Sequence, residues 1–362
     1  MSMLLILCAG AYLSFVLFII SGLFRHSEKP IEIAEDPPSV TIIVATRNEE
    51  KNLPSLIHDL VNQEYPTDKL EILFVDDRSL DSTPEILAEA VNNYSFLKTI
   101  RIEDKYLNMA PKKYALQTGI NAANNEIILT TDADCKIPKL WTSSMAYSVL
   151  HNGGITIGYS SVAGDSFFHE YQMIDFLGII AANAGASGWG QHWSGTGQNL
   201  AYKKSDFEFI NGFEPVADKL SGDDMYLVQS ISRHGGGCIN IDPNSFVTTQ
   251  PVDTLKQFVS QRIRWSSNAK DNMNKKVPFF TFLLSAFLCN TAIFLSLLLN
   301  SNGAVFVFLI KFILEGLVVY FGGMLFGTIV KPSVYLTWAI VQPLYIPFVG
   351  LLGLAGKFKW KL

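Results

Sequence analysis

Between residues 40 and 134, apolar strand patterns alternate with helix patterns, and this order limits the chain to an α/β fold. Residues 40–46 (VTIIVAT) form a continuous run rich in β-branched side chains, which is typical of a strand buried on both faces. A helix pattern at 53–63 and a strand at 71–77 (EILFVDD) follow. Ser82 and Thr83-Pro84 then signal the start of a second helix, and the strand LKTIRI, a helix near 112–123 and EIILTTDAD come after it. This βαβαβαβ order predicts a mainly parallel sheet with flanking helices.

Carboxylates stand where two of these predicted strands end. Asp76 and Asp77 end the second strand, and Asp132 and Asp134 form a D-x-D at the end of a later one. Mg²⁺ and Mn²⁺ are hard cations that take one or two carboxylates together with substrate phosphates. Because open α/β sheets bind ligands beyond the carboxyl ends of their strands, the pattern indicates a metal-diphosphate site. The alternative is that each acid only caps its turn.

Two further charged pairs stand at the start of predicted helices. Lys112 and Lys113 begin one helix, where they would suit phosphate oxygens or bulk water. Asp223 and Asp224 follow Gly222 and begin another helix, 223–235. The helix dipole favours acids at that place, and a general base would also be held rigidly there. Spacing alone leaves a structural and a functional role open for both pairs.

The apolar residues gather at the two ends of the chain. The hydrophobic share of 49% and the mean hydropathy of +0.23 are high for a soluble protein, and the excess lies in 3–24 and 278–356. Residues 3–24 have no charge and the length of a membrane span. Positive residues follow this segment, at Arg25 and Lys29, and none precedes it. This favours a retained anchor over a cleaved signal peptide, with the main domain in the cytosol.

Two C-terminal segments, 279–300 and 304–330, also have the length of membrane spans. Within the second, Lys311 and Glu315 lie four residues apart on one helix face. Because an isolated charge in lipid is costly, these side chains are expected to pair or to face the protein interior. They are either a structural ion pair near a helix end or the polar lining of a substrate path.

The last apolar segment, 333–356, is interrupted by Pro343 and Pro347. Three full C-terminal crossings from a cytosolic domain would place the basic tail 357–362 outside the cell, against the preference of its lysines. A re-entrant or interfacial segment, with its backbone buried against protein, is therefore the alternative to a full crossing, and the sequence alone leaves both open.

Three function classes are disfavoured by the sequence. The net charge of −5 gives no basic footprint for nucleic acid. The 4 cysteines include no C-x-x-C pair, which argues against a zinc site or a disulfide framework. The first strand is followed by Thr46-Arg47-Asn48-Glu49 and not by G-x-G-x-x-G, which argues against a dinucleotide-binding Rossmann domain.

Two more motifs complete the pattern. Residues 185–199 (GASGWGQHWSGTGQN) are rich in Gly, Trp and polar groups, as sugar sites often are, and residues 261–265 read QRIRW just before the membrane segments. Together with the acidic motifs, they resemble the membrane-bound family 2 glycosyltransferases of the GT-A fold that carry Q-x-x-R-W. Ceramide glucosyltransferase and polysaccharide synthases belong to that branch. The resemblance covers residues 40 to about 270.

The resemblance implies a nucleotide-diphosphate sugar, Mg²⁺ or Mn²⁺, and an inverting single displacement. Asp134, with Asp132, would hold the metal, and Asp224 would be the general base. The residues that it implies for binding the donor and acceptor are Thr46, Arg47, Glu49, Asp77, Lys112, Asp132, Gln198, Gln261 and Trp265. Arg264 would stabilise the leaving diphosphate.

This sequence departs from the family pattern at two places. The family often has Glu-Asp at the base motif, where this chain has Asp223-Asp224, so Asp223 stays an alternative base. The family also usually has glycine where Pro111 precedes Lys112.

The predicted organisation has six parts: an anchor (1–24), a linker (25–39), a GT-A domain (40–250), an interfacial helix with QRIRW (251–277), membrane segments (278–356) and a basic tail (357–362).

We expect an integral membrane hexosyl- or N-acetylhexosaminyltransferase, in the inner membrane if the source is bacterial, acting on a lipid or lipid-linked acceptor. A processive polysaccharide synthase is the alternative, for which four apolar segments are few. A non-catalytic scaffold of an export assembly would tolerate loss of the motif acids, and all of them are present.

Overall fold

The computed structural model describes residues 2–27, 36–104, 108–269 and 276–355. It divides into two compact units, each treated by itself below. The sheet unit comprises residues 27–161 and 194–250, and the helical unit comprises 1–26, 162–193 and 251–362. Most of the predicted linker 25–39, at 28–35, and the predicted basic tail with Lys357, Lys359 and Lys361 lie outside the described residues.

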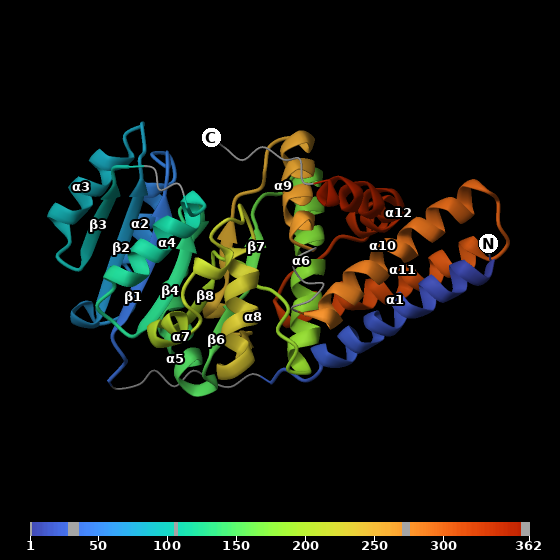
Figure 1. Ribbon diagram of the computed structural model, residues 1–362, viewed down its shortest axis with the longest axis horizontal. Coiled ribbons are helices and arrows are strands. Elements are labelled where there is room, and N and C mark those ends of the chain that lie inside the picture. Colours follow the sequence, from blue (N-terminus) through green and yellow to red (C-terminus); the bar gives the residue numbers. More distant parts are fainter. Residues whose placement is uncertain (1, 28–35, 105–107, 270–275, 356–362) are drawn as a thin grey trace. The chain divides into compact units, whose positions relative to one another are not determined.

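The sheet unit is built on a mixed, mainly parallel sheet (Figure 1). Its strands run in the order β3 (Leu97–Ile102), β2 (Leu70–Asp77), β1 (Val40–Thr46), β4 (Ile127–Asp132), β8 (Leu200–Lys203), β6 (Ile155–Gly158) and β9 (Gly237–Asn240). Strand β1 pairs in parallel with β2 and β4, while β8 is antiparallel to both of its neighbours. The predicted α/β fold class is therefore confirmed.

Within the described residues, six α-helices accompany this sheet in the sheet unit. They are α2 (Leu53–Val61), α3 (Thr83–Asn93), α4 (Pro111–Ala122), α5 (Trp141–Asn152), α7 (Lys204–Phe209) and α8 (Asp223–Gly235). Helix α2 buries Leu53, Leu56, Ile57 and Leu60, which follow the i, i+3, i+4, i+7 pattern. A small second sheet has the order β5 (Cys135–Lys136), β10 (Val247–Thr249) and β7 (Ser160–Val162).

One glycine lets α4 lie close to the central strands. A Cβ on Gly119 would stand 2.8 Å from Cγ2 of Ile43 and 3.0 Å from Cγ2 of Val75. Any larger residue would push the helix away from β1 and β2. Because the Lys112-Lys113 pair lies in the first turn of α4, this contact helps to fix both lysines relative to the strand ends.

The helical unit contains α1 (Ser2–Leu23), α6 (Phe167–Gly188), α9 (Leu255–Ser267), α10 (Val277–Leu298), α11 (Ala304–Leu325) and α12 (Pro332–Leu354) (Figure 1). Within the described part of the chain, four helices are long and apolar enough to cross a membrane: α1, α10, α11 and α12. This agrees with the predicted apolar segments, although α11 ends before 330, at Leu325.

Residues 162–193 group with the helical unit, although the sequence places them inside the predicted domain 40–250. The reason is the close packing of α6 on α1 and α11. A Cβ on Gly22 would lie 1.8 Å from the carbonyl oxygen of Gly185, and a Cβ on Gly322 would lie 2.5 Å from Cβ of Ala181. Small residues at such crossings let helix backbones approach each other, as they do in membrane proteins.

The two prolines of the last apolar segment do not break it. Helix α12 runs continuously from Pro332 to Leu354 with Pro343 and Pro347 inside it. The expectation of an interrupted segment is thus wrong, because a membrane helix tolerates proline where neighbouring helices compensate the lost backbone hydrogen bond. Whether the helix crosses the bilayer, and in which direction, stays a prediction.

Lys311 and Glu315 form a buried ion pair that joins two helices. The Lys311 ammonium lies 2.6 Å from Oε2 of Glu315, and the hydroxyl of Tyr12 on α1 donates to Oε1 at 2.5 Å. Both charged side chains are almost fully buried. The geometry is that of the structural pair, which lies inside α11 and not near its end.

Candidate active site

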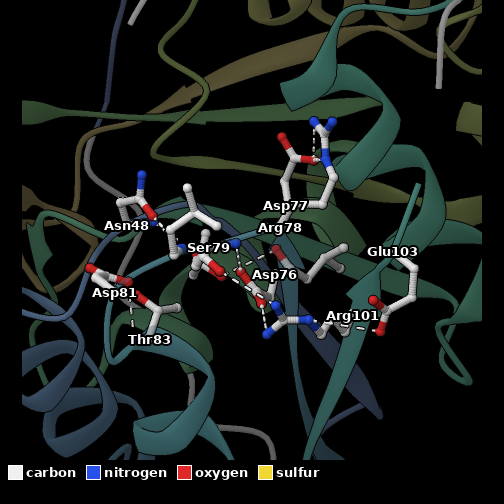
Figure 2. Close-up of polar contacts among 12 residues, drawn as sticks. Asn48, Asp76, Asp77, Arg78, Ser79, Asp81, Thr83, Arg101 and Glu103 are labelled. Atoms are coloured by element: carbon white, nitrogen blue, oxygen red, sulfur yellow. Dashed lines mark hydrogen bonds and ion pairs between the residues drawn. The ribbon is translucent and has the colours of Figure 1, made fainter. Parts of the chain in front are cut away.

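The β2–α3 turn is organised by Asp76 (Figure 2). Its Oδ1 accepts a hydrogen bond from the backbone N–H of Ser79 at 3.0 Å, and its Oδ2 lies 3.1 Å from Nη1 of Arg101. The carboxylate is 1% exposed. Asp76 therefore caps the turn, as the structural alternative predicts.

Asp77 has different partners from its neighbour. Its Oδ1 lies 2.7 Å from Nη2 of Arg78, and its Oδ2 lies 3.4 Å from Nη1 of Arg47. Figure 2 shows the Arg78 side chain against this carboxylate. The acid is buried while the two guanidinium groups are partly exposed. Asp77 thus holds two cationic groups at the carboxyl end of β2.

Thr46 and Glu49 tie the first strand end to its neighbour. The buried Thr46 hydroxyl donates to the carbonyl oxygen of Val75 at 3.2 Å. The backbone N–H of Glu49 donates to Oγ1 of Thr83 at 2.8 Å, and its carboxylate accepts from Asn52 at 2.6 Å. Both residues stand at the carboxyl end of β1, where the sequence predicts a ligand site.

The D-x-D motif sits at the end of β4, as predicted. The strand ends at Asp132, and Asp134 follows in the turn before β5. Burial, followed by the charges of Asp132 and Glu49, raises the pKa of Asp134 to about 6. Negative charge is therefore concentrated at this turn.

Lys112 is the cation that faces this turn. Its ammonium lies 2.7 Å from Oδ1 of Asp132, and both side chains are about one-third exposed, at 31% and 30%. Burial alone would lower the pKa of Lys112. Three nearby carboxylates outweigh that effect and raise the pKa above the ordinary lysine value: those of Asp132, Asp223 and Asp224. The D-x-D and D-D motifs thus belong to one cluster around Lys112, which we call the acidic cluster.

Gly197 lies directly against the acidic cluster. A Cβ on this glycine would stand 3.6 Å from Oδ2 of Asp223 and 3.9 Å from Nζ of Lys112. The carbonyl oxygen of Gly197 accepts a hydrogen bond from Oγ1 of Thr130 at 2.9 Å. The GTGQN stretch, including the half-buried Gln198, therefore forms one wall of the cluster.

The next residue, Asn199, fixes that wall from behind. Its Oδ1 accepts from Nε1 of Trp141 at 2.9 Å, and its amide donates to the carbonyl oxygens of Tyr159 and Ser245 at 2.7 and 2.8 Å. Asn199 is fully buried. The sequence gives no direct sign of this role, except that an asparagine lies between a glycine-rich stretch and a strand.

Lys113 positions the start of α8, a role that the sequence does not reveal. Its buried ammonium donates to the carbonyl oxygen of Ser221 at 3.3 Å and also to that of Lys219. Gly222 then turns the chain with φ +80°, and Asp223 and Asp224 occupy the first turn of the helix. Oδ1 of Asp224 lies 2.7 Å from the backbone N–H of Met225.

The donor set fits a divalent cation that shares its ligands with a substrate. Among the described residues, no group of three or more His, Cys, Asp or Glu side chains is arranged to hold a metal ion by itself. Asp132 and Asp134 offer hard oxygen atoms, and burial, followed by the charges of Asp132 and Glu49, raises the pKa of Asp134. Mg²⁺ and Mn²⁺ accept such an incomplete set when phosphates and water complete it.

The Q-x-x-R-W motif lies on α9 in the helical unit and is organised by its second residue. Arg262 is 5% exposed, and its Nε donates to Oδ2 of Asp175 on α6 at 2.6 Å. Its guanidinium carbon lies 4.4 Å from the Phe258 ring centre and 4.2 Å from the Trp265 ring centre. Nη1 also donates to Oε1 of Gln261. Arg262 thus touches two motif side chains at once.

Asp175 joins this arrangement to a third helix. Its Oδ1 accepts a hydrogen bond from Nε1 of Trp338 on α12 at 3.1 Å. Neither Asp175 nor Arg262 is among the predicted site residues, although an acid inside the apolar helix α6 is the kind of signal that marks a polar contact. Trp265 packs on Phe176 with ring centres 5.8 Å apart, while Arg264 is half-buried on the same helix.

Known proteins with similar sequences are glycosyltransferases or synthases of a glycolipid. Residues 41–210 match the family described as Glycosyl transferase family 2. A probable glycosyltransferase YdaM from Bacillus subtilis is 26% identical over 262 residues, which cover 69% of this chain and 61% of that protein. A beta-monoglucosyldiacylglycerol synthase from Nostoc is 38% identical over 113 residues, which cover 31% of this chain and 23% of that protein. The chain thus spans less than two thirds of the length of both relatives.

A solved structure supports the fold over nearly the whole chain. The mannosyltransferase PcManGT from Pyrobaculum calidifontis, solved in complex with GDP-Man and Mn²⁺, superposes with a TM-score of 0.65 at 20% identity. The match covers 98% of this chain and 99% of that one. It confirms the predicted GT-A-type fold with its N- and C-terminal apolar helices.

Proposed function

Because the chain contains a family 2 glycosyltransferase domain and four helices that can cross a membrane, we propose that it glycosylates a membrane lipid. In this proposal the sugar comes from a nucleotide-diphosphate donor and passes to a lipid or lipid-linked acceptor. The sheet unit carries the chemistry on the cytosolic side, and the spans hold the enzyme at its acceptor.

The observation that carries the proposal is the acidic cluster. Asp132, Asp223 and Asp224 all act on one ammonium, that of Lys112, beside a glycine wall. Crowded carboxylates repel each other, so their arrangement around one lysine favours the binding of a cation or a proton together with the substrate.

The donor would lie along the carboxyl ends of β1, β2 and β4. In this proposal Arg47 and Asp77 would contact the nucleotide, and Lys112 would contact a phosphate oxygen. The ion pairs Arg47–Asp77 and Lys112–Asp132 at these strand ends support it. Mg²⁺ or Mn²⁺ held by Asp134 with Asp132 would neutralise the diphosphate. The bound Mn²⁺ and GDP-Man of PcManGT support a divalent ion and a nucleotide sugar.

Asp224 is the proposed general base. It would accept the proton of the acceptor hydroxyl while that oxygen forms a bond to the anomeric carbon. The bond from this carbon to the diphosphate oxygen breaks on the opposite face, so the configuration inverts. Asp223 is the alternative base, because both acids stand in the first turn of α8. Gln261, Arg264 and Trp265 lie on α9, and their roles in binding substrate and the leaving diphosphate stay a prediction.

The lipid acceptor is supported by the helical unit and by a relative. The name of the Nostoc enzyme describes a synthase of a glucosylated diacylglycerol. Four candidate spans are few for a pore that would thread a polymer, which favours transfer of single sugars.

The test is a donor and acceptor screen of the full-length protein purified in detergent. Release of free nucleoside diphosphate is measured for a panel of nucleotide sugars with Mn²⁺ or Mg²⁺, with and without lipids, and products are identified by mass spectrometry. We expect release that depends on both lipid and metal, with one sugar added. A polymer ladder would instead indicate the processive alternative. Absence of release with every donor from folded protein would refute the proposal.

A further inference from the structure

Tyr202 has a buried hydroxyl group without a hydrogen-bond partner. The residue lies on β8, next to the strand β4 that ends in the D-x-D motif, and its side chain is fully buried. Among the described residues, none donates a hydrogen bond to its hydroxyl or accepts one from it. A buried polar group in this state costs free energy, because it gives up hydrogen bonds to water and gains none in the protein. Groups of this kind are found at functional sites, where a fold departs from its most stable arrangement.

Tyr202 lies on the same face of the sheet as the acidic cluster. It is paired with Ile128 of β4, and side chains that are paired across two strands point to the same face. Alternate residues of a strand share a face, so Thr130 and Asp132 lie on this face as well. The Asp132 carboxylate contacts Lys112, which places the cluster and the Tyr202 ring on one side of the sheet.

Helices α7 and α8 pack over this part of the face. Helix α7 packs on β8, and α8 packs on β6, a neighbour of β8. The Tyr202 ring stacks on Phe207 of α7, with ring centres 6.2 Å apart. A Cβ on Gly195 would lie 3.1 Å from Leu200 of β8 and 3.1 Å from Val228 of α8. Because Leu200 and Tyr202 share a face, the Tyr202 ring is held between the sheet and these helices.

The charge that acts on the Tyr202 hydroxyl comes from the first turn of α8. Burial, followed by the charge of Asp223, raises the pKa of Tyr202. Asp223 is partly exposed, and its Oδ2 lies 3.6 Å from the position of a Cβ on Gly197. The charge of Asp223 also acts on Lys112. Asp223 thus has a cation on the open side of the cluster and a phenol on the buried side.

A bound diphosphate would change the balance of charge at Asp223. Lys112 is 31% exposed and lies 2.7 Å from Oδ1 of Asp132, within the field of Asp223. A diphosphate carries more negative charge than one carboxylate, so it would attract this ammonium. Asp223 would then lose part of the positive charge that neutralises it, while the hydrogen-bond donor of Tyr202 is unused.

We propose that Tyr202 is a positioning residue, which donates a hydrogen bond to the Asp223 carboxylate when a bound diphosphate draws Lys112 away. A hydrogen bond from a phenol to a carboxylate is stronger than one between neutral groups. It fixes Asp223 on the buried side of the cluster and leaves Asp224 to accept the proton of the acceptor hydroxyl. This role rests on the proposed function, and it gives the two adjacent acids different tasks.

Two matched variants, Tyr202→Phe and Tyr226→Phe, test the state of the hydroxyl. Both remove one phenol oxygen and keep the ring, but the Tyr226 hydroxyl on α8 donates to the carbonyl oxygen of Ile210 at 3.0 Å. We expect Tyr226→Phe to lower the Tm of the full-length protein in detergent. Tyr202→Phe should keep or raise the Tm, because it removes a buried polar group that has no partner. A lower Tm for Tyr202→Phe would overturn the proposal, since the hydroxyl would then already be paired.

Turnover separates a positioning role from a purely structural one. The donor and acceptor are those that the screen of the proposed function identifies. Tyr202→Phe should lower kcat about tenfold, the effect of one lost hydrogen bond to a charged group. It should leave the KM for the donor unchanged, because the buried ring does not touch substrate, and Tyr226→Phe should change neither quantity. An unchanged kcat in the Tyr202→Phe protein would overturn the proposal and leave the proposed function standing.

A double variant tests whether Tyr202 acts through Asp223. In the Asp223→Asn protein, Tyr202→Phe should change kcat by less than about twofold, since two residues in one hydrogen bond are not additive. A full tenfold effect in that background would show that Tyr202 acts through another group. Absence of turnover in the unaltered protein with every donor and lipid would instead refute the proposed function, and the role of Tyr202 with it.

Discussion

The charged groups of the two units are balanced in opposite ways. In the helical unit, Arg262 meets Asp175 and Lys311 meets Glu315, with every side chain 6% exposed or less. In the sheet unit, one partly exposed lysine, Lys112, faces several carboxylates.

Physical chemistry explains why the two arrangements differ. A buried charge is costly unless it is paired, so a matched pair inside a helical bundle is what a stable fold requires. A surplus of acids at the open edge of a sheet costs free energy without a structural return. Several carboxylates crowded around one lysine therefore indicate the candidate active site. One-to-one buried ion pairs indicate residues that stabilise the fold.

The largest effect should come from the proposed general base in the unbalanced cluster. Asp224→Asn keeps the size and the polar oxygen at the start of α8 but cannot take a proton. We expect kcat to fall roughly 10²–10⁴-fold while donor affinity stays near that of the unaltered protein. Because the isosteric change leaves helix capping largely intact, the free energy of unfolding should stay close to that of the unaltered protein. Single-turnover kinetics and thermal unfolding measure the two quantities.

Asp223→Asn is the matched control for that variant and should be milder. If Asp223→Asn is inactive and Asp224→Asn works, the base is the first of the two acids. Full turnover in both variants would contradict the proposed displacement altogether.

The balanced pair in the helical unit should respond in the opposite sense. Asp175→Leu leaves the Arg262 charge buried without its partner and also removes the acceptor of Trp338. We expect a loss of about 3–5 kcal/mol in the free energy of unfolding. The double change Asp175→Leu with Arg262→Met should recover much of this loss, because no unpaired charge remains. Chemical denaturation of the three variants in detergent measures the coupling, and additive losses would contradict a paired role.

The sequence predicts strands and motifs well where one local pattern decides them. Strand β1 at 40–46, β3 at LKTIRI and helix α8 from Asp223 have the predicted bounds, since apolar runs and a Gly-Asp-Asp start are local signals. The D-x-D also lies at the end of its strand because a parallel sheet gathers strand ends at one edge.

The partners of individual charges depend on direction and on distant residues. Lys112 and Lys113 are adjacent, yet about 100° apart around the helix, so one faces Asp132 and the other holds the turn before α8. The contact between Asp175 and Arg262 joins residues that are 87 positions apart. No local pattern in the sequence reveals such contacts.

The raised pKa of Asp134 predicts how stability and metal binding depend on pH. The pKa of Asp134 is raised to about 6 in the folded protein, against about 3.9 for an unfolded aspartate. The folded state therefore holds this proton more tightly, and without metal its stability should fall as the pH rises from about 4 to about 6. At a pH where the Asp134 carboxylate is ionised, bound Mn²⁺ would offset this loss of stability.

Thermal unfolding with and without Mn²⁺ and a nucleoside diphosphate tests this account. We expect stabilisation of about 3 kcal/mol at pH 7.5 with the ligands near 100 times their Kd, and much less at pH 5. Asp134→Asn should lose the metal effect at both pH values. Equal stabilisation of that variant would show that the ion binds elsewhere.

The smallest effect on folding is expected at Gly197, the wall of the acidic cluster. A Cβ there would make only ordinary contacts, at 3.6 Å or more from its neighbours, so Gly197→Ala should change the free energy of unfolding by less than about 0.5 kcal/mol. The added methyl group nevertheless stands between Asp223 and Lys112, where the donor is proposed to lie. We therefore expect a several-fold rise in the KM for the donor.

Gly158→Ala is the contrasting variant, because its Cβ would lie 2.3 Å from the Asn199 side chain that fixes the same wall. It should destabilise the fold, so an unchanged donor KM in stable Gly197→Ala protein would show that the donor does not use this wall.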